Sequence, residues 1–366
     1  MSVLGVVMKQ LIRRILFLLA VTGLFFLSLF IKSPEKNPAA PNAVNAAYDD
    51  APLKKISVSN EWGALSAAVL GTADMLTHVA CEELEDGEAC SLKRLSETDE
   101  LMFDQLKAEL KNLEDVMTQN GVTVFQHTPE NISTDELFYR HDATFGVNFL
   151  CARSPLLIAG NKLIETAPTF PEALSAKFSI RKVLRFFLQT DLDTYLLSMP
   201  EPSPDFAADS PYLNTANALV DGKTVYVGVP ADSPYNAGVA WLRRALNGVF
   251  DVREIALKDG DRQLDDVLAF ISSDTLLYEK DAFAKELPAP LRRRKQIAVA
   301  PEDNVYGLGD MVVLSPKKIV LNEKNVKLKE ILEKLGVQVV PLPFDVIGAA
   351  QIDLRCLYLP LMRAAK

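Results

Sequence analysis

The sequence has 366 residues and 49% of them are hydrophobic, so the chain is long enough and apolar enough to bury a large core. The formal net charge is −9, and since the first 32 residues hold four basic and no acidic residues, the remainder carries about −13. A strongly acidic body repels nucleic acid phosphates and anionic lipid headgroups, which argues against a polyanionic partner.

The amino-terminal region predicts a membrane anchor. Residues 15–31 read ILFLLAVTGLFFLSLFI, an uninterrupted apolar run at the short end of the length that spans a bilayer. The basic segment 1–14 precedes it, as in a signal sequence, but no small-residue cleavage site follows closely, which favours an uncleaved anchor over a removed signal peptide. The excess of positive charge before the run predicts a single-pass protein whose soluble domain lies on the non-cytoplasmic side, in the periplasm or outside the cell.

A linker separates this predicted anchor from the folded part of the chain. Residues 32–54 are rich in Pro, Ala and Asn and have no apolar period, which indicates an extended tether. No second segment of this kind follows, so residues 55–366 are predicted to form one folded domain.

Two cysteines enclose a short acidic loop. Cys81 and Cys90 flank the residues EELEDGEA, and in an oxidising compartment their thiols could form a disulfide. A zinc site is disfavoured because no second pair of Cys or His stands at ligand spacing, so no metal is expected. Cys151 lies in an apolar stretch and is predicted to be a core residue.

One pattern recurs along the folded part: an amphipathic helix, a turn and a run of β-forming residues. It occurs at residues 100–125, 241–252 and 327–340. Short units of a turn residue, a Lys and β-formers occur at residues 160–164, 221–226 and 316–320. Repeated units of this kind indicate a pseudo-symmetric α/β ring rather than a doubly wound sheet. No GxGxxG or P-loop pattern follows a strand, so no nucleotide cofactor is expected.

Several segments spread over residues 56 to 363 match motifs of known enzymes. They are Asn60-Glu61-Trp62-Gly63, 138–142 ending in Arg140-His141-Asp142, 160–165, 213–217 (LNTAN), Gln263-Leu264-Asp265 and 354–361 around Cys356. In their residues and their order these segments resemble the glycine amidinotransferase and arginine deiminase families of the guanidine-modifying, or pentein, superfamily. The resemblance implies a five-bladed α/β propeller.

The resemblance also implies a chemistry for particular residues. In these families a cysteine thiolate attacks the guanidinium carbon, a histidine moves protons, and carboxylates hold the planar guanidinium by paired hydrogen bonds. Carried over to this sequence, Cys356 is the candidate nucleophile, while Asp142 and Asp265 are the candidate substrate-binding carboxylates.

Two site positions depart from the family pattern. Gln263 stands where the family has the His of a His-x-Asp segment, and Asn214 stands where it has the first Asp of an Asp-Ala-Ala segment. The Gly-Gly turn before the nucleophile is replaced by residues 351–352, and the stretch that should supply a downstream Arg offers only Lys280. Glutamine does not titrate near neutral pH, so it cannot move protons as histidine does.

Two functions remain open at the level of sequence. The first is a degraded relative, a possible pseudoenzyme, that binds a guanidino, ureido or amide compound or a partner, with weak or absent catalysis. The second is an active amidinotransferase or guanidine hydrolase that uses Cys356 with a relocated base. Cys356 could also be an ordinary buried residue, and His141 beside Asp142 is more readily explained as structural than as that base.

Overall fold

The computed structural model describes residues 55–73, 100–126, 150–154, 156–169, 180–202, 210–230, 235–258, 262–350 and 352–365. The predicted basic segment, anchor and linker (1–14, 15–31 and 32–54) lie outside these residues, as do Cys81, Cys90 and Asp142. Among the helices that are described, none is both long enough and apolar enough to cross a membrane.

Five three-stranded sheets make up the described part of the chain, and four of them share one connectivity. In each of the four, two strands form an antiparallel pair, a helix follows, and a third strand joins the second in parallel. The units are β3 (Leu156–Ala159), β4 (Lys162–Glu165), α7 (Arg181–Thr190), β5 (Tyr195–Ser198); β6 (Ala218–Asp221), β7 (Thr224–Pro230), α8 (Tyr235–Ala245), β8 (Asp251–Leu257); β9 (Leu268–Phe270), β10 (Thr275–Glu279), α10 (Ala289–Arg292), β11 (Lys295–Val299); and β12 (Met311–Ser315), β13 (Lys318–Asn322), α11 (Val326–Lys334), β14 (Gln338–Leu342).

The fifth sheet joins the two ends of the folded part. Strand β15 (Tyr358–Arg363) pairs antiparallel with β1 (Leu65–Leu70), which in turn pairs in parallel with β2 (Thr123–Gln126) after helix α4 (Glu100–Gln119). The same hairpin, helix and strand order therefore arises from segments almost 300 residues apart. Backbone hydrogen bonds between the last strand and the first close the ring.

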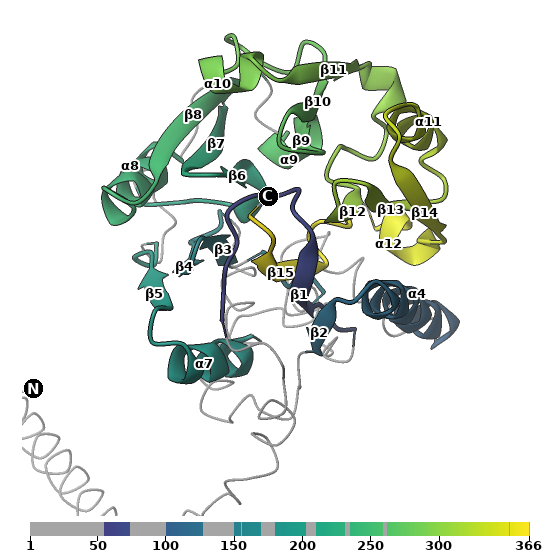
Figure 1. Cartoon of the computed structure of the whole chain (residues 1–366), viewed down its shortest axis with the longest axis horizontal. Coiled ribbons are helices and arrows are strands. Elements are labelled where there is room, and N and C mark those ends of the chain that lie inside the picture. Colours follow the sequence, from purple (N-terminus) through teal and green to yellow (C-terminus); the bar gives the residue numbers. More distant parts are fainter. Residues whose placement is uncertain are drawn as a thin grey trace, which may run out of the picture. The chain divides into compact units, whose positions relative to one another are not determined.

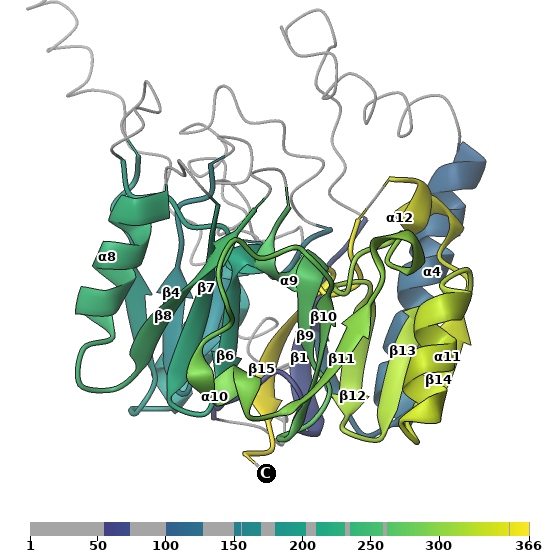
Figure 2. The ribbon, with the colours of Figure 1, turned by 90° about the horizontal axis from the view of Figure 1, so that it is seen from above.

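The five sheets lie around a common centre. In Figure 1 the strands nearest the centre are β3, β6, β9, β12 and β15, and the outermost strands are β5, β8, β11, β14 and β2. Figure 2 shows α8, α4 and α11 outside the strands that they connect. The sheets remain five separate three-stranded sheets among the described residues, so no continuous closed sheet forms. This arrangement confirms the α/β class and the repeated unit predicted from the sequence.

Helix α4 shows why the sequence pattern predicts these units. Its side chains at three- and four-residue spacing, Leu106, Leu110, Leu113 and Met117, are all buried in the core beside the first sheet. Burying an aliphatic side chain of this size contributes roughly 1.5–3 kcal/mol. The helix ends before Gly121, whose φ of 79° lies in the left-handed region that glycine adopts without strain.

Two contacts position the segments that meet at the centre of the ring. Residues 57–60 form isolated bridges to Met362, Gly160 and Asp221, so this stretch links three of the sheets. The stretch leads directly into Glu61. Glu109 of α4 is buried and accepts hydrogen bonds from the first three backbone N–H groups of α12 (Asp345–Ala349), at 2.8, 2.9 and 3.1 Å. This cap fixes the helix that leads into Cys356.

Candidate functional site

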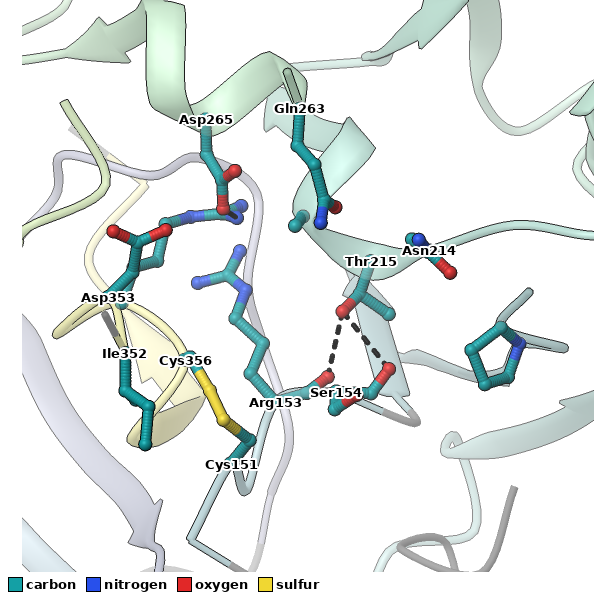
Figure 3. Close-up of a pocket in the computed structure, with 13 residues that line it drawn as sticks. Cys151, Arg153, Ser154, Asn214, Thr215, Gln263, Asp265, Ile352, Asp353 and Cys356 are labelled. Carbon is teal, nitrogen blue, oxygen red and sulfur yellow. Dashed lines mark hydrogen bonds and ion pairs between the residues drawn. A yellow bond between two sulfur atoms is a disulfide. The ribbon is translucent and has the colours of Figure 1, made fainter. Parts of the chain in front are cut away.

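A pocket of about 250 Å³ lies where the loops before β3 and β15 meet two short helices. These helices are η4 (Thr215–Asn217) and α9 (Leu264–Val267). The lining residues are Cys151, Arg153, Ser154, Pro168, Asn214, Thr215, Ala216, Gln263, Asp265, Ile352, Asp353, Arg355 and Cys356. Figure 3 shows that the side chains of Gln263, Asp265, Arg153 and Cys356 converge on this space. Four of the five site positions predicted from the sequence thus lie around one pocket, and the fifth, Asp142, is outside the described residues.

Gln263 precedes α9 and lies at the rim of the pocket. Its backbone N–H donates to a carboxylate oxygen of Asp266 at 2.7 Å, and the next N–H, of Leu264, donates to Asn217 Oδ1 at 2.9 Å. These bonds hold the backbone and leave the side chain directed into the pocket (Figure 3). The buried Gln263 Oε1 has no hydrogen-bond partner among the described residues, so a group that donated to it would relieve the cost of a buried unpaired acceptor.

Asn214 is the residue before η4 and is buried in the wall of the pocket, on the same side as Gln263 (Figure 3). Its Oδ1 accepts a hydrogen bond from the backbone N–H of Thr169 at 3.1 Å. The neighbouring Thr215 donates through its hydroxyl to the carbonyl oxygens of Arg153 and Ser154, at 3.0 and 3.1 Å. Asn214 therefore lies in a hydrogen-bonded wall, and it brings no negative charge to the pocket.

Asp265 lies in α9 and holds a guanidinium, but that guanidinium belongs to the chain itself. Arg355 Nη1 donates to Asp265 Oδ2, and Arg355 Nη2 donates to the carbonyl of Ala218 at 2.9 Å. Burial raises the pKa of Asp265 to about 6 despite the nearby positive charge of Arg355. The other oxygen, Oδ1, is buried without a hydrogen-bond partner among the described residues.

Glu61 joins the two arginines of the site and was not predicted as a site residue. It accepts hydrogen bonds from Arg153 Nη2 at 2.9 and 2.8 Å, from Arg355 Nη2 at 3.4 Å and from the N–H of Val220 at 3.1 Å. Burial opposes its charge, but Arg153, Arg355 and Arg363 outweigh burial and lower the pKa of Glu61 to about 2. The carboxylate is therefore ionised at neutral pH and neutralises part of the arginine charge beneath the pocket.

Three carboxylates form the acidic side of the pocket and its neighbourhood. One oxygen each from Asp265, Asp266 and Asp353 lies within 4.8 Å of the others, a spacing that could hold a cation. Arginines already accompany two of them, since Arg355 pairs with Asp265 and Arg262 lies 3.9 Å from Asp266. Burial and the charges of the surrounding aspartates raise the pKa of Asp353 well above its ordinary value.

Cys356 is bonded to Cys151, which corrects the prediction that Cys151 is a core residue. The two cysteines form a disulfide with their Cα atoms 4.8 Å apart, and both side chains are only half-buried in the wall of the pocket. In this form Cys356 carries no thiol, so it cannot attack a substrate until the bond is reduced. The separation of 205 residues hid the pair from the sequence pattern.

Arg153 and Ser154 are further pocket residues that the sequence analysis missed. They lie in the loop before β3, the first strand of the hairpin that turns at Gly160, whereas the segment assigned from the sequence ends at Asp142. The signal that could have identified Arg153 and Ser154 is an Arg followed by a small polar residue just before a run of hydrophobic strand residues. Arg153 is 4% exposed, and its Nη1 has no hydrogen-bond partner among the described residues.

Lys280 does not replace the missing downstream arginine at this pocket. It is exposed after β10 and is absent from the pocket lining. None of the three histidines, at positions 78, 127 and 141, falls within the described residues. The described part of the site consequently offers carboxylates, amides, arginines and a disulfide, but no imidazole.

No protein-family model matches the chain. The sequence is 24% identical to the inosamine-phosphate amidinotransferase of Streptomyces glaucescens over 325 residues, which is 79% of this chain and 91% of that protein. The fold is similar to SxtG, an amidinotransferase of saxitoxin biosynthesis from Microseira wollei, with a TM-score of 0.67, 16% identity and coverage of 85% of this chain and 98% of that one. It is also similar to the DDAH of Pseudomonas aeruginosa in complex with citrulline, with a TM-score of 0.55, 12% identity and coverage of 81% and 99%.

Proposed function

We propose that this chain, which belongs to the amidinotransferase family of the pentein superfamily, binds a small guanidino or ureido compound and has lost most or all of the family's transfer activity. The observation that carries the proposal is Gln263, which faces the pocket where the family has its proton-transferring histidine. An amide can donate and accept hydrogen bonds, but it does not exchange protons with a leaving amine near neutral pH.

The polar atoms of the pocket support binding. Gln263 Oε1 and Asp265 Oδ1 are acceptors without a described partner, and Arg153 Nη1 is a donor without one. Buried polar atoms left unpaired cost about 1–3 kcal/mol each, which a ligand that supplies the matching groups would recover. A planar ureido or guanidino group presents N–H donors at fixed angles, as these acceptors require.

A second function, an active Cys356-dependent transferase or hydrolase, is favoured by one observation. Burial raises the pKa of Asp265 to about 6, so this carboxylate exchanges protons closer to neutrality than an ordinary aspartate does. It would act as the relocated base once Cys356 is reduced to a thiol. The ion pair with Arg355 opposes this, because it holds one of the carboxylate oxygens.

Replacing Gln263 by leucine is expected to weaken binding of L-arginine or L-citrulline by about tenfold, since one hydrogen-bond acceptor is lost at constant shape. Isothermal titration calorimetry on the full chain measures the affinity. Gln296→Leu is the matched control, because Gln296 lies on β11 and does not line the pocket. Failure of the unmodified chain to bind either compound, or equal affinity in both variants, would contradict the proposal.

We also propose that residues 15–31 anchor the protein in a membrane with residues 55–366 on the non-cytoplasmic side. The support is the apolar run and the basic residues that precede it. Deleting residues 1–33 is expected to move the protein from the membrane pellet to the soluble fraction after cell lysis, with an unchanged melting temperature. A deleted chain that stays in the pellet, or that melts without cooperativity, would show that the segment does more than anchor.

A further inference from the structure

We propose that Cys151 and Cys356 form a redox-active disulfide, which small thiols open and re-form in the folded protein. The inference concerns the sulfur chemistry of the pocket wall and does not depend on the ligand binding proposed above. It assigns to this site a second class of reactant, a low-molecular-weight thiol. Such thiols control whether Cys356 is bonded in the disulfide or is a free thiol.

The position of the disulfide allows attack without unfolding. Both cysteines line the pocket, and neither belongs to the buried core. Figure 3 shows the sulfur–sulfur bond at the edge of the pocket, beside Ile352 and below the side chain of Arg153. Thiol–disulfide exchange requires an incoming thiolate to reach one sulfur, so exposure to a pocket is the condition for reaction in the native state.

Other contacts hold the two cysteine loops together. The N–H of Arg153 donates to the carbonyl of Cys356 at 3.2 Å, so the loops are joined by a backbone hydrogen bond beside the disulfide. The Arg153 guanidinium binds Glu61 through two hydrogen bonds, and Thr215 binds the Arg153 carbonyl. Since these bonds involve no sulfur, breaking the disulfide leaves the frame of the pocket in place.

The reaction balances with two thiol molecules. A thiolate attacks one sulfur of the Cys151–Cys356 bond, forms a mixed disulfide and releases the other cysteine as a thiolate, which takes a proton. A second thiol attacks the mixed disulfide at the sulfur of the small molecule, releasing the remaining cysteine and a disulfide of two small thiols. The protein gains two electrons and two protons, and Cys356 becomes a free thiol in the wall of the pocket that Gln263 and Asp265 also line.

The test uses the full chain in detergent with Cys81→Ser and Cys90→Ser, so that only Cys151 and Cys356 can react. The oxidised protein is treated with millimolar reduced glutathione without denaturant and then with N-ethylmaleimide, and peptide mass spectrometry counts the blocked thiols. We expect both cysteines to be labelled, at a rate within about tenfold of that in urea-unfolded protein. The reduced protein should still melt cooperatively.

Three results would overturn the inference. The first is labelling that requires urea, which would mark a structural cross-link closed to thiols. The second is loss of cooperative melting on reduction, and the third is two free thiols before any reductant is added. Cys151→Ser gives an independent check: it should melt cooperatively and be labelled once, at Cys356, without reductant. Titration of both redox forms with L-citrulline tests the proposed function separately, because absent binding would leave the exchange result standing.

Discussion

Glu61→Gln is expected to lower the free energy of unfolding by roughly 3–5 kcal/mol, because it removes one charge from a buried network and leaves its partners uncompensated. Glu61 is 7% exposed and binds the guanidinium groups of Arg153 and Arg355. Among the described residues, Asp265 would remain as the only carboxylate paired with Arg355, and Arg153 would lose its ion-pair partner. Urea denaturation followed by circular dichroism measures the change.

Glu254→Gln is the matched control for this experiment. Glu254 also pairs with an arginine, Arg243, at 2.8 Å, but both side chains are about half exposed. Solvent screens such a pair, so the midpoint of unfolding should stay where it is in the unmodified protein. Equal losses in the two variants, or no loss in Glu61→Gln, would show that the network beneath the pocket contributes no stability.

Gln263→His combined with Asn214→Asp is expected to increase the alkylation rate of Cys356 at neutral pH about tenfold. An imidazolium next to a thiol lowers the thiol pKa from its ordinary value of about 8.5, and one pKa unit below that value gives close to ten times more thiolate at pH 7. The Asp at position 214 would help to hold the imidazolium. The measurement needs the Cys151→Ser background, in which Cys356 is a free thiol.

The pH profile of the alkylation rate separates this explanation from a general loosening of the pocket. A lowered thiol pKa shifts the profile toward acid, whereas a more exposed thiol reacts faster at every pH with the same midpoint. Gln296→His in the same background is the control, since that residue lies outside the pocket. A midpoint that stays near the ordinary thiol value in the double variant would mean that positions 214 and 263 do not act on Cys356.

The repeated unit of the fold could be predicted because it depends on the spacing of residues that are close together in the sequence. The helix at 326–334, the turn at Gly336 and the strand at 338–342 depend on spacing within about fifteen residues, and the structure places them where the sequence predicts them. The pairing of β15 with β1 could not be predicted in this way. It joins segments from the two ends of the folded part, and no local period specifies a partner at that distance.

The pocket was predictable only where motif order identified its residues. Gln263, Asn214, Asp265 and Cys356 were found in that way, and all four line the same space. Their contacts were not predictable, because the partner of Asp265 is Arg355, 90 residues away, and the partner of Cys356 is Cys151. One oxygen of the Asp265 carboxylate, predicted to bind a substrate, is paired with Arg355 of the same chain, and only coordinates reveal such pairing.

The measurement that tests the central claim most directly is turnover of L-arginine by the fully reduced, otherwise unmodified protein. Product formation, as ornithine, citrulline or ammonia, is compared with that of Cys356→Ser under the same reducing conditions. If Gln263 has removed the proton transfer that the reaction needs, the two proteins should give the same background rate. Turnover well above background that disappears in Cys356→Ser would contradict the account and identify an active enzyme with a different base.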